Sequence, residues 1–297
     1  MTQAVPRLVT VDARPAHGRA EVEALAGLPA RWRPVVGGYG VEVWRVSGPQ
    51  DARMLKTGTG AAAARVVREA AVWEQIAGVV PAASYGRGVR HGSGEGWAWL
   101  TTPWLDSPSL WDLYAPVRGR ADEVREQALA AAVAVCLAVA GAHRAGWVHG
   151  DLQPHHIILA PDEAQLIDWS SAWSPTSGLP PVATHTSGSV HQASYELLAR
   201  SDGLHAAVAT VADDVWALAA SIWMAASGRW PRNYRCLGID PSSFTETELA
   251  RVVSRHRAPL GRIGHWPELE TALRTVLDAP EASRPTAAEL GRNLRAL

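Results

Sequence analysis

The sequence predicts an α+β protein in which a small strand-rich lobe precedes a larger helical lobe. Between residues 33 and 100, Val, Trp and Tyr alternate with polar residues as in half-buried strands, and one stretch, 61–77, has the apolar spacing of a helix. We place the small lobe at 33–106 and the large lobe at 107–297, with 1–32 as an N-terminal extension of unknown role that holds a short helix at 20–28. The helices expected in the large lobe are 107–115, 121–144, 193–201, 210–227, 246–255, 267–278 and 286–296.

The composition fits a globular protein with a well-filled core, because 47% of the 297 residues are hydrophobic and only 19% are charged. The formal net charge of −1 argues against a nucleic-acid partner held by bulk positive potential. Lys56 is the only lysine among the 28 lysines and arginines. One ammonium in an otherwise arginine-only chain indicates that a compact point charge is needed at that position.

We expect neither a membrane span nor a secretory signal. The most apolar stretch, 127–142, is shorter than the roughly 20 residues of a membrane-spanning helix, so it predicts a buried helix. The first residues lack the continuous apolar core of a secretory signal. Cys136 and Cys236 are too few for a disulfide framework and are expected to be free thiols. These features predict a cytoplasmic protein without a membrane partner.

Clusters of Gly and Pro predict loops at 92–96 and 175–181. The second cluster lies in a long irregular stretch, 170–192, and a loop of that length in a compact protein is usually functional or disordered.

Two carboxylates stand where hydrophobic, strand-like runs begin or end. Asp151 lies in His-Gly-Asp-Leu-Gln-Pro-His-His at 149–156, just before Ile-Ile-Leu, and Asp168 ends Leu-Ile-Asp at 166–168. Two acids presented in this way can divide the work of phosphoryl transfer. One orients the attacking hydroxyl and accepts its proton, and the other holds the metal that neutralises phosphate charge.

The order and spacing of these residues resemble the catalytic loop and the metal-binding motif of protein kinases. The His-Gly-Asp and Ile-Asp-Trp motifs are also similar to the corresponding motifs of the aminoglycoside and choline phosphotransferases. The resemblance implies a bilobal protein-kinase-like fold, with ATP and Mg or Mn as cofactors. It also implies that Asp151 is the catalytic base, that Asp168 is a metal ligand, and that Gln153 stands where protein kinases have a lysine near the transferred phosphate.

Two further motifs of the large lobe extend the resemblance. Asp214 begins Asp-Val-Trp-Ala-Leu-Ala, which is similar to the kinase helix whose aspartate steadies the catalytic-loop backbone. Arg284, in Ser-Arg-Pro-Thr, resembles the arginine that pairs with the glutamate ending the activation segment. Residues 188–196 have the length of the kinase stretch that ends in this glutamate, so the resemblance implies that Glu196 is the partner of Arg284. Small-molecule phosphotransferases normally lack such an ending.

In the small lobe, the run Val-Gly-Gly-Tyr-Gly-Val at 36–41 resembles a glycine-rich loop that covers phosphates, because glycine lets the backbone approach them closely. A plain hairpin turn is the alternative interpretation. The third glycine position of the motif falls on either Gly40 or Val41. The candidate nucleotide-binding glycines are Gly37, Gly38 and Gly40.

Lys56, in Arg-Met-Leu-Lys, resembles the kinase strand lysine that contacts the α- and β-phosphates. A buried lysine needs a carboxylate partner. Glu69 is the better candidate by local pattern, and Glu74, which has the more usual separation, is the alternative. The stretch 97–110 resembles the gatekeeper and hinge that bind adenine, and it nominates Thr102, Pro103 and Leu105.

The chain also departs from the kinase pattern. His156 replaces the asparagine that binds a second metal; imidazole suits Mn or Zn better than Mg, and a hydrogen bond within the loop is the alternative role. Gly150 removes the arginine that reads an activation-loop phosphate, and Trp169-Ser170 replaces Phe-Gly. Candidate hydroxyls in the activation loop are Thr184, Thr186 and Ser187.

The leading functional prediction is ATP-dependent phosphorylation of a hydroxyl, with Ser or Thr of a peptide or protein as acceptor. The lost asparagine and lysine favour a second hypothesis, a pseudokinase that binds a nucleotide or a partner protein without transfer. A third is a small-molecule kinase acting on an alcohol. A related possibility is a kinase of peptide natural-product biosynthesis whose product a separate lyase eliminates.

Overall fold

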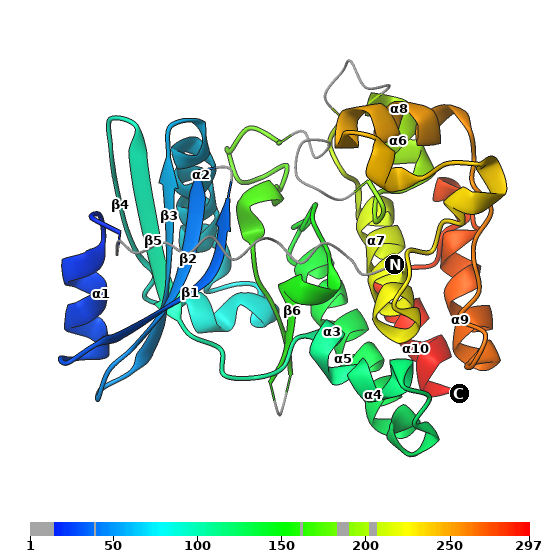
Figure 1. Cartoon of the computed structure of the whole chain (residues 1–297), viewed down its shortest axis with the longest axis horizontal. Helices are drawn as coiled ribbons and strands as arrows, with labels where there is room; N and C mark the ends of the chain where they lie inside the picture. The colour runs from blue at the N-terminus through cyan, green and yellow to red at the C-terminus, as the bar shows by residue number, and fades with distance from the viewer. Residues whose placement is uncertain (1–14, 39, 161–162, 183–189, 202–206) are drawn as a thin grey trace. The chain divides into compact units, whose positions relative to one another are not determined.

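The computed structural model describes residues 15–38, 40–160, 163–182, 190–201 and 207–297. Contacts between residues divide the chain into two compact units, Met1–Asp106 and Ser107–Leu297. The first unit contains a five-stranded sheet and the second contains most of the helices (Figure 1), so the predicted α+β class is confirmed.

The sheet of the first unit is antiparallel throughout, in the order β1-β2-β3-β5-β4. Its edge strand β1 contains Pro34 beside an irregularity in the register, as expected for a residue that cannot donate a ladder hydrogen bond. One helix, α2 (Ala61–Ile76), contacts β3 and β5, and a 3-10 turn at Pro81–Gly86 follows it. The strands are β1 (Arg31–Gly38), β2 (Val41–Ser47), β3 (Ala52–Thr59), β4 (Arg90–Gly94) and β5 (Trp97–Pro103).

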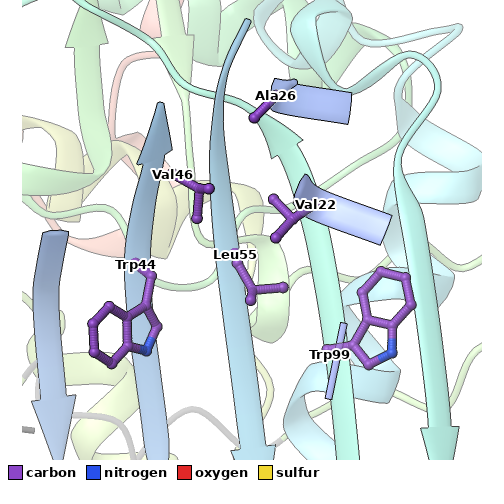
Figure 2. Packing of buried hydrophobic residues seen from close by; sticks show 6 residues of the cluster. All are labelled: Val22, Ala26, Trp44, Val46, Leu55 and Trp99. Carbon is purple, nitrogen blue, oxygen red and sulfur yellow. The ribbon is translucent and has the colours of Figure 1, made fainter. Parts of the chain in front are cut away.

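The helix α1 (Arg19–Ala26) covers one face of this sheet. Figure 2 shows Val22 and Ala26 of α1 beside sheet residues, and these two and four sheet residues form one buried cluster. Leu55 belongs to that cluster, and because strand side chains alternate between faces, the adjacent Lys56 points to the opposite face. The cluster's sheet members are Trp44, Val46, Leu55 and Trp99. Residues 19–32, which the sequence assigned to a separate extension, thus supply a helix and the start of β1 to the first unit.

The prediction of a loop at 92–96 is wrong, because Gly92 and Gly94 lie in β4. Only residues 95 and 96 form the turn between β4 and β5. The register pairs Gly92 with Trp99 and Gly94 with Trp97. A Cβ on either glycine would come within 2.7 Å of the paired indole. These glycines therefore make room for large cross-strand neighbours, and they do not break the strand.

The second unit is mainly helical, with one two-stranded ribbon, β6 (Ile157–Leu159) and β7 (Ala164–Leu166). Its helices agree closely with the predicted ranges, except that the first splits in two and that a 3-10 turn at Asp122–Val124 precedes the longest. They are α3 (Leu110–Leu113), α4 (Ala115–Arg118), α5 (Arg125–Arg144), α6 (Tyr195–Ser201), α7 (Val211–Ser227), α8 (Glu246–Arg255), α9 (Pro267–Leu277) and α10 (Ala287–Arg295).

Among the described residues, the helix of α5 and its preceding turn is the one segment long and apolar enough to cross a membrane. However, α5 packs against α7, α10 and β7, and ten of its 20 residues are buried, as expected of a core helix. Burial raises the pKa of the Cys136 thiol in this helix to about 12, and both Cys136 and Cys236 are free thiols.

Candidate active site

The ribbon β6–β7 brings the two predicted carboxylates together in the second unit. Residues 149–156 lead into β6, and Asp168 follows β7 by two residues. Because the two strands are antiparallel, the start of β6 lies beside the end of β7, and the Ile167 amide donates to the His156 carbonyl at 2.9 Å. The catalytic-loop candidates and Asp168 therefore belong to one local structure.

A buried aspartate of α7 fixes the backbone of this loop. Asp214 accepts hydrogen bonds from the amides of His149, at 2.7 Å, and Gly150, at 2.9 Å. Residue 150 has φ +77, and a Cβ there would lie 2.8 Å from the Ser171 carbonyl oxygen. The role expected for Asp214 is confirmed, and the loop geometry explains why residue 150 is glycine.

His149 connects the loop to the residue before Asp168. Its Nδ1 accepts from the Asp151 amide at 3.3 Å, so its Nε2–H donates to the Ile167 carbonyl at 3.1 Å. The ring is fully buried against Trp169, and burial lowers the pKa of His149 to about 4. The histidine is therefore neutral at physiological pH and holds the loop in one conformation.

The predicted base and its neighbour are in direct contact. Gln153 Nε2 donates to Asp151 Oδ1 at 2.8 Å, and the Asp151 side chain is 6% exposed. An amide donor in this position orients the carboxylate without adding a positive charge. The arrangement suits an aspartate that must present one oxygen in a fixed direction.

His156 also has a defined orientation. Its Nδ1 lies 2.9 Å from the Asp151 carbonyl, an acceptor, so Nδ1 carries the proton and the lone pair of neutral imidazole is on Nε2. Nε2 lies 3.9 Å from Asp168 Oδ2. The loop hydrogen bond that was the alternative role for His156 therefore exists together with a geometry suited to metal binding, since metal-binding histidines usually donate their other N–H to a carbonyl or carboxylate.

This donor set fits a divalent cation that is shared with phosphates. In the part of the chain that the structure describes, no group of three or more His, Cys, Asp or Glu residues could hold a metal on its own. Mg²⁺ and similar ions are usually bound by one or two protein ligands together with substrate phosphates and water. Asp168 and His156 would hold such an ion, which would neutralise charge on the transferred phosphate.

In the first unit, Lys56 on β3 pairs with Glu69 on α2. Lys56 Nζ lies 2.7 Å from Glu69 Oε2, and the side chains are 12% and 3% exposed. Glu74, the alternative partner, instead contacts His91 at 2.8 Å on the surface. The sequence pattern therefore identified the correct carboxylate, and Lys56 is held as a buried ion pair.

The glycine run 36–41 includes the end of β1 and the start of β2. Gly38 pairs with Val41, and Gly40 adopts φ +78 in the turn. Its carbonyl accepts from the Thr59 amide at 2.9 Å, which ties the turn to the end of β3. Gly37 and Gly38 belong to β1 itself, and Tyr39 lies outside the described residues. Phosphate binding by this hairpin stays a prediction.

The residues predicted to form the hinge lie at the end of β5 and just after it. Thr102 is buried on β5, and its hydroxyl donates to the Pro103 carbonyl at 3.2 Å. The Trp104 amide donates to Ala52 at 2.8 Å, which holds the chain just before Leu105. Adenine recognition by Pro103 and Leu105 stays a prediction, as do roles for Thr184, Thr186 and Ser187, which lie outside the described residues.

One contact of the site was missed by the sequence analysis. The Ser170 hydroxyl donates to Asp168 Oδ1 at 2.9 Å, while Trp169 donates its indole N–H to the Leu166 carbonyl at 2.7 Å. The sequence showed that Trp169-Ser170 replaces Phe-Gly, but it gave no sign that the serine turns back onto the aspartate.

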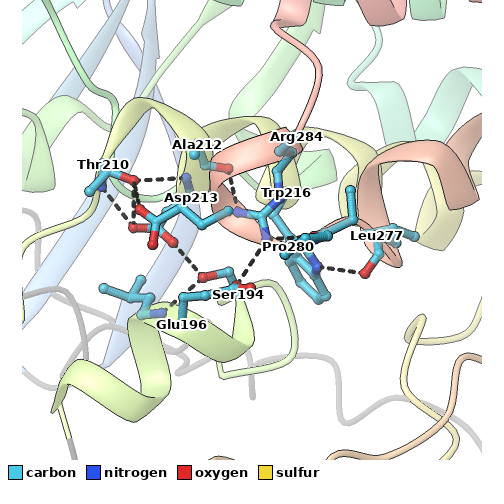
Figure 3. Close-up of polar contacts among 12 residues, drawn as sticks. Ser194, Glu196, Thr210, Ala212, Asp213, Trp216, Leu277, Pro280 and Arg284 are labelled. Carbon is cyan, nitrogen blue, oxygen red and sulfur yellow. Dashed lines mark hydrogen bonds and ion pairs between the residues drawn. The ribbon is translucent and has the colours of Figure 1, made fainter.

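The ion pair predicted between the end of the loop region and the last helical region is also present. Arg284 donates to Glu196 at 2.9 Å and to the Ala212 carbonyl at 3.0 Å (Figure 3). Burial alone would raise the pKa of Glu196, but the hydrogen bond and charge of Arg284 lower it below its usual value. The same figure shows Asp213 accepting from Ser194 and from Thr210, the N-cap of α7, so the start of α7 is joined to the segment that precedes α6.

Comparison with known proteins places these residues in a family context. The model of the lipopolysaccharide kinase (Kdo/WaaP) family, a member of the protein kinase-like superfamily, matches residues 63–173. The matched segment contains Glu69 and the candidate residues 151–168, whereas Lys56 and the glycine hairpin precede it. A search of curated proteins finds no match. Over this segment the chain is similar to lipopolysaccharide kinases, and the protein is a kinase, that is, a phosphotransferase.

Proposed function

We propose that this protein transfers the γ-phosphoryl group of ATP to a hydroxyl, with Asp151 as the base that accepts the hydroxyl proton. The observation that carries the proposal is the loop 149–156. There, Asp214 fixes the backbone, Gln153 orients the Asp151 carboxylate, and His156 faces Asp168. Lys56, held by Glu69, would bind the ATP phosphates.

The divalent cation supplies charge neutralisation at the transferred phosphate when it is bound. The residues of this chain contribute orientation. Asp168 and His156 would bind the ion, and the Asp151 carboxylate would accept the proton of the attacking hydroxyl. His156 stands at the asparagine position of the resembled motif, and its Nε2 would serve as the metal ligand in place of an amide oxygen.

The acceptor that the comparisons favour is a sugar hydroxyl, because the matching family is one of lipopolysaccharide kinases. This corresponds to the small-molecule alternative raised by the sequence. Ser or Thr of a peptide is the second candidate, and the Arg284–Glu196 ion pair supports it, because that ending is typical of protein kinases.

Replacing Asp151 by Asn tests the proposal directly. Asn keeps the shape but cannot accept a proton, so transfer should fall by about 10²- to 10⁴-fold while ATP binding persists. Transfer is measured as ADP release and acceptor phosphorylation, with sugar and peptide acceptors in parallel. The matched control is Asp122→Asn, at an exposed aspartate paired with Arg125. Full turnover in Asp151→Asn would exclude the proposed base, and ATP binding without turnover by the wild-type chain on any acceptor would favour the pseudokinase hypothesis.

We expect Mn²⁺ to support activity at least as well as Mg²⁺. The reason is His156, since imidazole is a better ligand for Mn²⁺ than for Mg²⁺, which prefers oxygen. His156→Asn, which restores an oxygen donor, should move the preference toward Mg²⁺. Initial rates over a titration of each ion, in wild type and variant, measure this preference. Clearly poorer activity in Mn²⁺ than in Mg²⁺ for the wild type would exclude a role of His156 in binding the ion.

A further inference from the structure

Ser170 makes a contact that the glycine of the resembled motif cannot make. Its Oγ donates to Asp168 Oδ1 at 2.9 Å, whereas Asp168 Oδ2 faces His156 Nε2 at 3.9 Å. The two carboxylate oxygens therefore have different surroundings. We propose that Ser170 is a positioning residue that fixes the Asp168 carboxylate so that Oδ2, together with His156, receives the divalent cation. The metal is part of the proposed function, and the role of Ser170 rests on it.

The backbone holds Ser170 in this position. Asp168 has φ 60, in the left-handed region, which a short polar side chain such as aspartate tolerates better than most. The next three residues, Trp169–Ser171, form a 3-10 turn that brings Ser170 back toward Asp168. The turn is anchored by the fully buried Trp169, which restrains the backbone position of Ser170.

The second cation ligand is oriented in an equivalent way. His156 donates from Nδ1 to the Asp151 carbonyl, which directs Nε2 toward Asp168. Each expected ligand thus has a hydrogen-bond partner that orients it, namely the Asp151 carbonyl for His156 and the Ser170 hydroxyl for Asp168. Loss of such partners typically weakens metal binding about 10- to 100-fold, because the ligand then has more orientations to lose on binding.

Removal of the Ser170 hydroxyl should therefore weaken cation binding without unfolding the chain. We expect Ser170→Ala to raise the dissociation constant for Mn²⁺ about tenfold, and Ser170→Gly, which restores the residue of the resembled motif, to do the same. Ser170→Thr keeps the hydroxyl and should stay within about twofold of wild type, because the side chain is only half-buried. The matched control is Ser254→Ala, a serine on α8 whose hydroxyl donates to Arg251.

The experiment uses the full chain in excess over a non-hydrolysable ATP analogue and measures free Mn²⁺ by electron paramagnetic resonance. The same titration with the analogue alone gives the Mn²⁺ that the nucleotide binds by itself, and this amount is subtracted. A thermal unfolding midpoint within about 2 °C of wild type shows that each variant is folded. Weakened binding in the Ala and Gly variants, with rescue by Thr, supports the positioning role. Unchanged or tighter binding in Ser170→Ala, or a Thr variant as weak as Ala, overturns it.

This outcome can be separated from the fate of the proposed transfer reaction. Mn²⁺ binding is measured without an acceptor and without turnover. If no acceptor is ever phosphorylated but the binding pattern is as expected, Ser170 keeps its role and the transfer function fails. If transfer occurs and Ser170→Ala binds Mn²⁺ like the wild type, the positioning role alone is excluded.

Discussion

A single buried histidine illustrates how one residue joins the parts of this site. His149 accepts from the Asp151 amide and donates to the Ile167 carbonyl, so it needs the neutral ring with the proton on Nε2. A protonated ring would carry a second N–H toward the Asp151 amide and would place a charge in a fully buried position. Burial is therefore the main cause of the lowered pKa, which is about 4.

This lowered pKa makes a prediction for stability against pH. Between pH 6.5 and about 4, the unfolded chain binds a proton at residue 149 that the folded chain does not, so stability falls as the pH is lowered through this range. The gap between the two pKa values corresponds to roughly 3 kcal/mol once the pH is below both. His149→Gln, which keeps a donor for the Ile167 carbonyl, should flatten this part of the profile.

Urea unfolding at several pH values measures the effect. His256→Gln, at an exposed histidine, is the matched control. His191 also has a pKa lowered by burial, to about 3, so the wild-type profile contains both contributions and only the difference between variant and wild type reports on His149. An equal slope in wild type and His149→Gln would contradict the assignment.

At the scale of single residues, sequence patterns identified the residues whose contacts require one particular kind of side chain. Glu69 was preferred over Glu74 from its local pattern, and Asp214 and Glu196 from their motifs, and the structure shows all three contacts. Gly150 and Ser170 could not be read in this way. The need for glycine at 150 depends on a positive φ and on a carbonyl of a different segment, and the Ser170 contact depends on a 3-10 turn.

Among the elements, α1 shows how a short helix with weak sequence signals becomes part of a core. Alone, a helix of eight residues is marginal in water. Here Val22 and Ala26 are completely buried against the sheet, and Glu23 accepts from the indole N–H of Trp32 on β1. Tertiary packing, which sequence periodicity over so few residues does not reveal, therefore determines that this segment belongs to the first unit.

We expect Val22→Ala to lower the free energy of unfolding of the first unit by about 2 kcal/mol, because it removes two buried methyl groups and leaves a cavity. Val67→Ala is the matched control on α2, where the side chain is 45% exposed, and it should change stability by less than about 0.5 kcal/mol. Denaturant unfolding followed by tryptophan fluorescence measures both, since Trp44 and Trp99 belong to the same cluster as Val22. Equal effects of the two substitutions would show that α1 does not pack on the sheet in solution.

The strand β4 shows a case in which a sequence pattern predicts the wrong structure. Glycines usually mark loops, but β4 contains two because indoles of β5 occupy the space that side chains would fill. The helices of the second unit were easier to predict, because their apolar periodicity extends over several turns. Thr210, Thr245 and Thr286 each begin a helix with a reciprocal capping box, and each predicted helix starts within one residue of its threonine.

On the scale of the whole molecule, the helix α7 fixes both the candidate catalytic loop and the segment that precedes α6. From α7, Asp214 holds the loop backbone at residues 149 and 150, and Ser221 donates to the Leu152 carbonyl at 3.1 Å. The adjacent Asp213 accepts from Ser194, which precedes α6. A buried helix with polar groups at these positions can fix loops that are distant in sequence, because each buried polar group needs a partner.

The composition of the whole chain allows a decisive test of nucleotide binding. Because Lys56 is the only lysine, any ε-amino group that a nucleotide-directed reagent modifies must be that of Lys56. An acyl-phosphate derivative of ATP transfers its acyl group to a nearby amine, and we expect it to label the peptide 54–65. Trypsin cuts after Arg53 and Arg65 but not after acylated Lys56, so this peptide stays in one piece. Excess ATP should prevent the labelling, since the ammonium would then be covered by phosphates.

Two variants separate binding from simple reactivity. Lys56→Arg keeps the positive charge beside Glu69 but removes the reactive ε-amine, so labelling at this position must vanish. Glu69→Gln keeps the amine but removes its buried partner, and labelling at low probe concentration should fall at least severalfold, because the ammonium is no longer held in one position. Labelling of Lys56 that saturating ATP does not reduce would mean that the lysine lies outside the nucleotide site. In that case the ion pair with Glu69 would be only a structural contact between β3 and α2, and ATP would have to bind without the one ammonium that this arginine-rich chain contains.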